Sequence, residues 1–251
     1  MNLPPVRVPR MAALPVPSQV AMLPGELAPF DAGVPALDPR LLTLDPALMM
    51  AVAVRAIGAG AAGMTAVGVA GLQHGDGATT VARGLAVCLA EAFHKRVVLV
   101  EANQRSACLR SIYGLPEGPG LADVIARRVS LGGALQMAGE HRQVVVLPAS
   151  LRESGAIDAS GLRELLSALL TYVDAAVVDM APMLPYRDTG AMCSALDGVV
   201  LVMRGGHSTV ADGKVAVAKV REAGVPVLGS VLNRERQVVP KFFERMLGAH
   251  T

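Results

Sequence analysis

Short apolar runs alternate with stretches of helical periodicity over much of the chain. The apolar runs are TAVGVAG (65–71), RVVLVEA (96–102), QVVVLPA (143–149), AAVVDMAP (175–182), GVVLVMR (198–204) and PVLGSVLN (226–233). Because these runs are apolar at consecutive positions, they are typical of strands buried on both faces. Residues 81–93, 162–173 and 210–224 have the pattern of helices. The alternation predicts an α/β fold, a doubly wound and mostly parallel sheet with helices on both faces.

The two ends of the chain differ from this pattern. Ten of the 17 prolines fall within residues 1–46. Proline removes backbone donors and interrupts helices, so we expect 1–46 to be a disordered tail and 47–251 to be the folded domain. A docking arm for a partner is the alternative for the tail. At the other end, KFFERMLGAHT (241–251) is typical of a short amphipathic helix.

Residues 47–72 are long and apolar enough to raise the alternative of a membrane span. Arg55, five glycines and the polar loop that follows argue against it. We expect instead an alanine-rich helix to about residue 60, a turn and the first core strand. Prolines also interrupt the N-terminus before an apolar targeting segment of useful length forms.

Composition excludes several classes of protein. Hydrophobic residues make up 52% of the 251 residues and charged residues 18%, which excludes full-length disorder. A net charge of +2 and 3% aromatic residues argue against nucleic-acid binding. The three cysteines form no CxxC pair and suit a reduced compartment. The five histidines share no ligand spacing, so we expect no metal site of their own.

A glycine-rich turn joins the first strand to a helix. It consists of Gly75, Asp76, Gly77, Ala78, Thr79 and Thr80. Glycines let backbone N–H groups converge on phosphate oxygens, and a helix N-terminus favours an anion. The Thr79 hydroxyl is placed to bind Mg²⁺. A working loop of this type has lysine directly after the second glycine, where this chain has Ala78.

Taken in order, the motifs of residues 60–236 resemble the bacterial tyrosine-kinase branch (BY-kinases, CpsD/CapB-like) of the MinD/ParA-type deviant Walker P-loop ATPases. GDGATT stands where that branch has PGEGKST, and VLVEANQR stands where it has a strand ending in IDADLR. GLADV, VDAAVVDMAP and VLNR match later motifs. The resemblance implies the P-loop NTPase fold and ATP or ADP with Mg²⁺ as the ligand.

The resemblance also assigns roles to residues. Asp179 matches the Walker B aspartate, so it is expected to be catalytic and to hold Mg²⁺ with Thr79. Glu101 and Asn103 stand where the family has two aspartates, and Glu101 is the second candidate catalytic residue. Asn233 matches a residue that lies against the adenine.

Departures from the family pattern bear on the activity. Ala78 removes the phosphate-binding lysine, and losing a charge-assisted contact costs about 1.5–3 kcal/mol in binding. Nucleotide binding is therefore expected to be weak or absent, and turnover by this loop alone inefficient. No tyrosine follows Tyr186, so autophosphorylation of a C-terminal tyrosine cluster is not expected.

The sequence thus predicts a degenerate BY-kinase-like protein that regulates exopolysaccharide or capsule biosynthesis or export. The resemblance implies a cytoplasmic location beside the inner membrane, through a membrane chain-length-determining (co-polymerase) protein as partner, with homo-oligomers as a further option. Two alternatives stay open. One is an active ATPase or tyrosine kinase whose missing cation comes from a partner. The other is a spatial organiser of the MinD/ParA kind.

Overall fold

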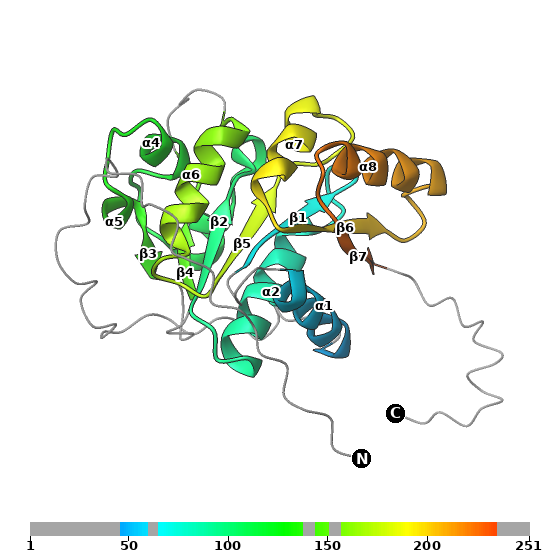
Figure 1. The fold of residues 1–251 in the computed structure, drawn as a ribbon, viewed down its shortest axis with the longest axis horizontal. Coiled ribbons are helices and arrows are strands. Elements are labelled where there is room, and N and C mark those ends of the chain that lie inside the picture. Colours follow the sequence, from blue (N-terminus) through cyan, green and yellow to red (C-terminus); the bar gives the residue numbers. More distant parts are fainter. Residues whose placement is uncertain (1–45, 60–64, 138–143, 151–156, 235–251) are drawn as a thin grey trace, which may run out of the picture.

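The computed structural model describes residues 46–59, 65–137, 144–150 and 157–234. Its seven strands form one sheet in the order β3-β4-β2-β5-β1-β6-β7, with helices on both faces (Figure 1). The strands are β1 (Thr65–Gly71), β2 (Val97–Glu101), β3 (Gln136–Met137), β4 (Val144–Leu147), β5 (Ala175–Met180), β6 (Gly198–Arg204) and β7 (Val227–Asn233). All neighbouring strands run parallel except the β3–β4 pair. The predicted doubly wound α/β fold is confirmed.

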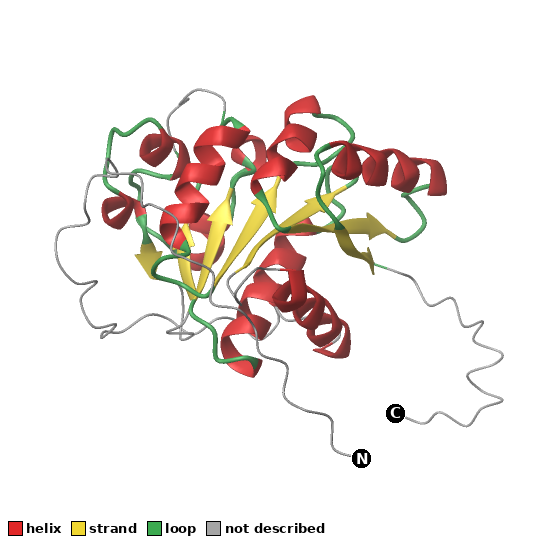
Figure 2. Cartoon of the chain, in the orientation of Figure 1, coloured by secondary structure: helices red, strands yellow, loops and turns green. Residues whose placement is uncertain are grey.

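Two helices, α1 (Pro46–Ala59) and α2 (Ala78–Ala92), pack on one face of the sheet (Figure 2). The other face carries α6 (Ala159–Leu169) and α8 (Val210–Glu222). Shorter helices complete the described part: α3 (Leu109–Tyr113), α4 (Leu121–Ile125), α5 (Leu131–Ala134), α7 (Arg187–Met192), and the 3-10 turns η3 (Gln104–Ser106) and η4 (Cys193–Ala195).

The apolar runs of the sequence follow from burial on two sides. Successive side chains of a strand point to opposite faces, so a strand between two helical layers needs apolar residues at every position. In β5, Ala176 and Val178 pack in the cluster under α6 and α8, while Ala175 and Val177 pack against α2. All six residues of β5 are buried.

The six apolar runs all form strands, as predicted. The helices predicted over 81–93 and 210–224 are present as α2 and α8. The helix predicted over 162–173 is present as α6, which begins three residues earlier and ends four residues earlier. The pattern missed the two-residue β3 and the short helices α3, α4, α5 and α7, because elements this short contain too few residues to show a period.

The segment that raised the membrane alternative folds as expected, into α1 and then β1. Arg55 donates from Nη1 to the Leu228 carbonyl oxygen at 2.9 Å, which ties α1 to β7. Among the described residues, no helix combines the length and hydropathy needed to cross a bilayer. The tail predicted for 1–46 falls outside the described residues except for Pro46, and the helix predicted for 241–251 falls wholly outside them.

Replacing Leu85 by alanine should lower the free energy of unfolding by about 2–5 kcal/mol, because the fully buried side chain would leave a cavity between α2 and the sheet. Urea denaturation followed by circular dichroism measures this change. Val54→Ala is the control, since Val54 is 56% exposed on α1 and its loss should change stability by less than about 0.5 kcal/mol. Equal effects of the two substitutions would contradict the packing described.

Candidate phosphate-binding site

The loop between β1 and α2 lies at the carboxyl end of the sheet's central region. Gly75 and Gly77 both have left-handed backbone conformations, with φ of 81° and 93°. A Cβ on Gly77 would also collide with the side-chain amide of Asn233. Position 77 therefore needs glycine for two reasons, its backbone angle and its neighbour.

Seven consecutive backbone N–H groups of this loop and the first turn of α2 are open, which here means that no described residue accepts a hydrogen bond from them. Among the described residues, none accepts a hydrogen bond from the N–H of residues 74–80. The N–H groups on either side of this stretch do have acceptors. Gln73 N–H donates to Asp76 Oδ2 at 2.8 Å, and Val81 N–H donates to the Gly77 carbonyl oxygen at 3.1 Å. Open amides at the start of a 15-residue helix suit an anion such as phosphate.

Thr79 and Asp179 meet beside these amides. The Thr79 hydroxyl donates to Asp179 Oδ2 at 2.7 Å, and Asp179 is 1% exposed at the end of β5. Burial raises the pKa of Asp179 to about 7; the Thr79 hydrogen bond opposes this shift, and the nearby charge of Glu101 adds to it. The second carboxylate oxygen, Oδ1, is buried without a partner among the described residues.

Glu101 lies next to Asp179 in the register of β2 and β5, but its carboxylate is already bound. Oε1 accepts from the N–H groups of Cys108 at 2.6 Å and Leu109 at 2.8 Å, and Oε2 accepts from Ala149 N–H at 2.9 Å. These bonds hold the start of α3 and the segment that follows β4 to the end of β2. The geometry supports a structural role, while the catalytic role expected for Glu101 stays a prediction.

Asn233, the last residue of β7, connects the edge strand of the sheet to the loop. Its Nδ2 donates to the Asp76 carbonyl oxygen at 2.8 Å, so the end of β7 supports the glycine-rich turn directly. Thr80 lies in the first turn of α2, half-buried like Ala78. The adenine contact expected for Asn233 stays a prediction.

The sequence did not single out a cluster that joins three loops at the edge of this site. His74 Nε2 lies 2.9 Å from the Tyr186 hydroxyl, and the Arg105 guanidinium lies 4.2 Å from the centre of the Tyr186 ring. Arg105 also pairs with Asp188 at 3.1 Å. Since the partners are up to 112 residues apart, no local pattern could have joined them.

Arg83 is the second feature that sequence reasoning missed. It is 5% exposed, one helical turn beyond Thr79, and its guanidinium lies 5.0 Å from the centre of the Tyr113 ring. Among the described residues, no carboxylate pairs with it. A signal was available, because an arginine is unusual on the apolar side of a helix.

The described groups fit a magnesium ion with a nucleotide. Mg²⁺ prefers oxygen ligands, and the Thr79 hydroxyl and the unpartnered Oδ1 of Asp179 provide them. Asn103 Oδ1 is a further buried oxygen without a partner among the described residues. No cluster of three or more His, Cys, Asp or Glu side chains suited to a metal occurs in the part of the chain that the structure describes. A metal here would therefore need ligands from the nucleotide as well.

Replacing Glu101 by glutamine should lower the free energy of unfolding by about 1.5–3 kcal/mol, because the new amide would face backbone N–H donors. Chemical denaturation measures this loss. The matched control is Glu164→Gln, which breaks only the exposed pair with Arg127 and should cost less than about 1 kcal/mol. An unchanged stability of the Glu101 variant would contradict the structural role.

The stability of the protein should depend on pH through Asp179. Between its ordinary pKa of 3.8 and about 7, the folded state holds this proton and the unfolded state does not, so stability falls as pH rises through this range. Asp179→Asn removes the effect. Denaturation in EDTA at several pH values should show the variant gaining stability over the parent protein from pH 4 to 7. A difference that does not vary with pH would contradict the raised pKa.

The chain is similar in sequence to proteins that are named ATP-binding proteins and tyrosine-protein kinases. No family model matches it. It is 29% identical to an uncharacterized ATP-binding protein of Methanocaldococcus jannaschii, over 67% of this chain and 64% of that protein. It is 26% identical to the tyrosine-protein kinase YwqD of Bacillus subtilis, over 64% of this chain and 69% of the kinase. With the tyrosine-protein kinase etk of Escherichia coli, the match covers 66% of this chain and only 23% of the kinase.

Solved structures share the fold. The chimerical protein CapA2B2 superimposes with a TM-score of 0.66 and 20% identity, over 81% of this chain and 96% of that chain. The septum site-determining protein MinD of Pyrococcus horikoshii, complexed with Mg-ADP, superimposes with a TM-score of 0.58 and 24% identity, over 72% and 76%. By sequence the chain is thus similar to bacterial tyrosine kinases and to an ATP-binding protein, and it has the P-loop fold of BY-kinase domains and MinD/ParA-type ATPases.

Proposed function

We propose that this chain is a degenerate BY-kinase-like protein that binds ATP or ADP with Mg²⁺ weakly and transfers phosphate poorly or not at all. In this proposal it acts as a nucleotide-responsive regulator of exopolysaccharide or capsule biosynthesis or export. Its place is the cytoplasmic side of the inner membrane, beside a membrane chain-length-determining protein.

One observation carries the binding part of the proposal: the open N–H groups of residues 74–80 lie beside the Thr79–Asp179 pair. The amides would hold phosphate oxygens. Thr79 and Asp179 would hold the metal, which supplies charge neutralisation when it is bound. The M. jannaschii relative is named ATP-binding and the P. horikoshii structure contains Mg-ADP, and both support this assignment.

The alanine at position 78 supports the part of the proposal that says this chain transfers phosphate poorly. Phosphoryl transfer depends on positioning and on cations that stabilise charge on the transferred group. Ala78 supplies no cation. Arg83 is the buried cation nearest in sequence, but Nε bonds to the Tyr113 hydroxyl at 3.4 Å and its charge is held against that ring. The site therefore retains features of anion binding and lacks the lysine that would act on the phosphoryl group.

The role in polysaccharide export rests on the sequence resemblance to CpsD/CapB-like proteins, supported by relatives that are named tyrosine-protein kinases. The matched part of this chain spans less than a quarter of etk, so a partner could supply what the longer protein contains. A protein without efficient catalysis would then act by docking to its membrane partner and leaving it, according to the nucleotide bound.

Isothermal titration calorimetry with Mg-ADP and Mg-ATP tests the proposal. The parent protein should bind weakly, and Ala78→Lys should bind about 10- to 150-fold more tightly, because one charge-assisted contact is worth about 1.5–3 kcal/mol. Thr79→Val should lose the benefit of Mg²⁺ while it keeps the amides. The matched control is Ala126→Lys, which adds the same charge at the exposed end of α4, away from the loop.

Absence of binding by both the parent protein and Ala78→Lys would contradict the nucleotide site. Tight binding and rapid ATP turnover by the parent protein alone would contradict the degenerate state. Equal tightening by Ala126→Lys and Ala78→Lys would show that net charge, rather than the loop, determines affinity.

A further inference from the structure

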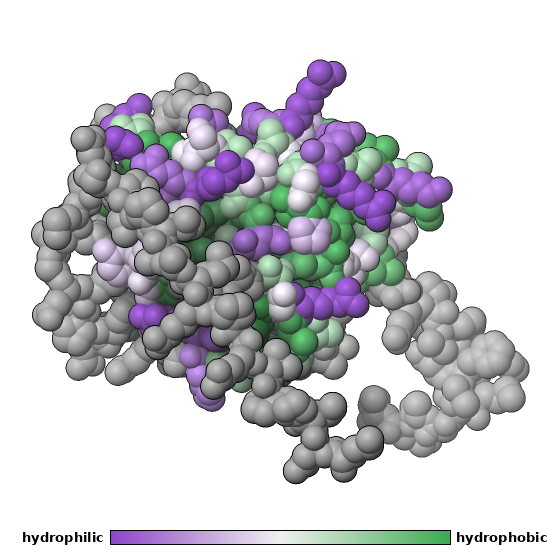
Figure 3. All heavy atoms as spheres, in the orientation of Figure 1, coloured by the Kyte–Doolittle hydropathy of each residue, from purple (hydrophilic) through white to green (hydrophobic). Residues whose placement is uncertain are grey.

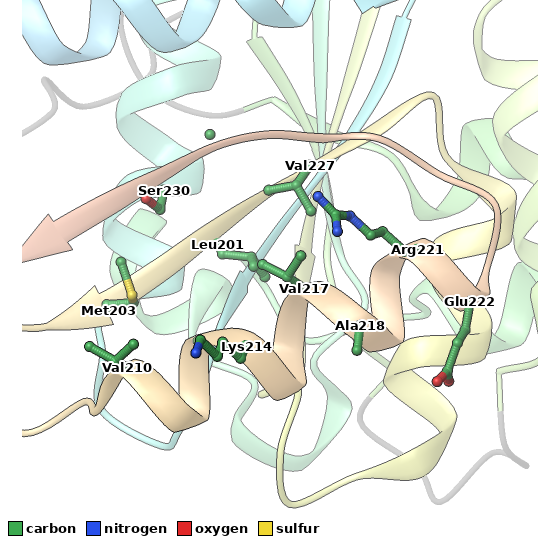
Figure 4. Close-up of a pocket in the computed structure, with 12 residues that line it drawn as sticks. Leu201, Met203, Val210, Lys214, Val217, Ala218, Arg221, Glu222, Val227 and Ser230 are labelled. Atoms are coloured by element: carbon green, nitrogen blue, oxygen red, sulfur yellow. The ribbon is translucent and has the colours of Figure 1, made fainter.

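An open apolar groove of about 1020 Å³ lies between α8 and the last two strands of the sheet (Figure 4). Leu201, Val217 and Val227 point into the same space from β6, α8 and β7. Val210 at the start of α8 is 78% exposed beside it. No aromatic residue lines the groove within the part of the chain that the structure describes.

The groove lies at the end of the sheet. β7 pairs with β6 on one side, and none of the described strands pairs with its other edge. On the opposite face of β7, α1 packs and Arg55 bonds to Leu228. On that face Ala51, Val52 and Leu228 line a smaller hollow. Figure 3 shows hydrophobic residues at the surface of the molecule among hydrophilic ones. An open edge beside an apolar groove is a surface that folded proteins usually cover.

We propose that residues 235–251 of the same chain cover this groove, with Phe242 and Phe243 as the side chains that fill it. The chain holds four phenylalanines, and only Phe93 lies in the described part. Two of the other three stand next to each other in the 17 residues that follow Arg234. The segment that follows β7 in the sequence thus contains two of the bulkiest apolar side chains of the protein.

The residue that precedes the segment favours a reversal of the chain direction. Arg234 directly follows β7 and has a left-handed φ of 54°, a conformation typical of a chain reversal. Residues 235–239, if extended, cover about 16 Å, which is most of the length of the seven-residue β7. Pro240 then suits the entry to a helix.

The rest of the segment matches the groove in length and pattern. As a helix, residues 241–251 would be about 16 Å long, and the 13-residue α8 is about 20 Å long. Phe242, Met246 and Phe243, Leu247 form two pairs spaced four residues apart, so they share one face of that helix. This face would lie on Leu201, Val217 and Val227, with the charged residues of the segment outward.

Methyl NMR of the full chain with labelled methionine tests the proposal. Met203 lines the groove, so its methyl signal should be shifted upfield by the ring of a docked phenylalanine. The signal is assigned by Met203→Leu. In Phe242→Leu/Phe243→Leu, which keeps the segment apolar but removes both rings, the upfield shift should disappear. The methyl of Met50, 41% exposed on α1, should be unchanged.

Phe30→Leu is the matched control, because it makes the same chemical change in the N-terminal part of the chain. Loss of the shift in Phe30→Leu instead would assign the groove to the N-terminal segment and overturn the proposal. A shift that disappears on dilution would assign the groove to a second copy of the chain and would overturn the proposal as well. A Met203 methyl that shows no upfield shift in the parent protein, or no response to the double substitution, would equally overturn it.

Discussion

The parallel pairing of β1 with β5 determines the candidate site. It brings the loop that follows β1 against the carboxylate that ends β5, so Thr79 and Asp179 meet at 2.7 Å although 100 residues separate them. Everything else at the site depends on this juxtaposition. The amides of residues 74–80 open beside it, and Asn233 holds the loop from the side of β7.

In the proposed function, the charges of the side chains at this point distinguish the site from that of a working kinase. Asp179 and Glu101 are buried on adjacent strands. Ala78 stands at the position where a lysine would offset their negative charge. Two features of the structure reduce the cost of burying these carboxyl groups without a nearby lysine. Three backbone N–H groups bind Glu101, and burial raises the pKa of Asp179 to about 7. Both carboxyl groups are thus accommodated in the fold with alanine at position 78.

The fold could be predicted from the sequence because its signals are local. A run such as AAVVDM is apolar at consecutive positions, and that pattern alone indicates a strand covered on both faces. The glycine-rich turn was equally visible, since Gly77 precedes a helix and follows a strand. In each case the residues that carry the information are neighbours in the chain.

The roles of single polar residues were not visible for the opposite reason. Glu101 accepts hydrogen bonds from residues 7, 8 and 48 positions away, and nothing near it in the sequence marks those donors. Arg83 was visible as an unusual residue, but its position over Tyr113 depends on how α3 packs beside α2.

In the proposed function, the backbone amides of residues 74–80, with Thr79 and Asp179, form an anion site although position 78 is alanine. Amide ¹H–¹⁵N NMR spectra recorded during addition of Mg-ADP examine this property residue by residue. The signals of residues 74–80 should shift first and furthest, together with that of Asp179. Unchanged signals at these residues, or larger shifts at another part of the sheet, would contradict the assignment of the site.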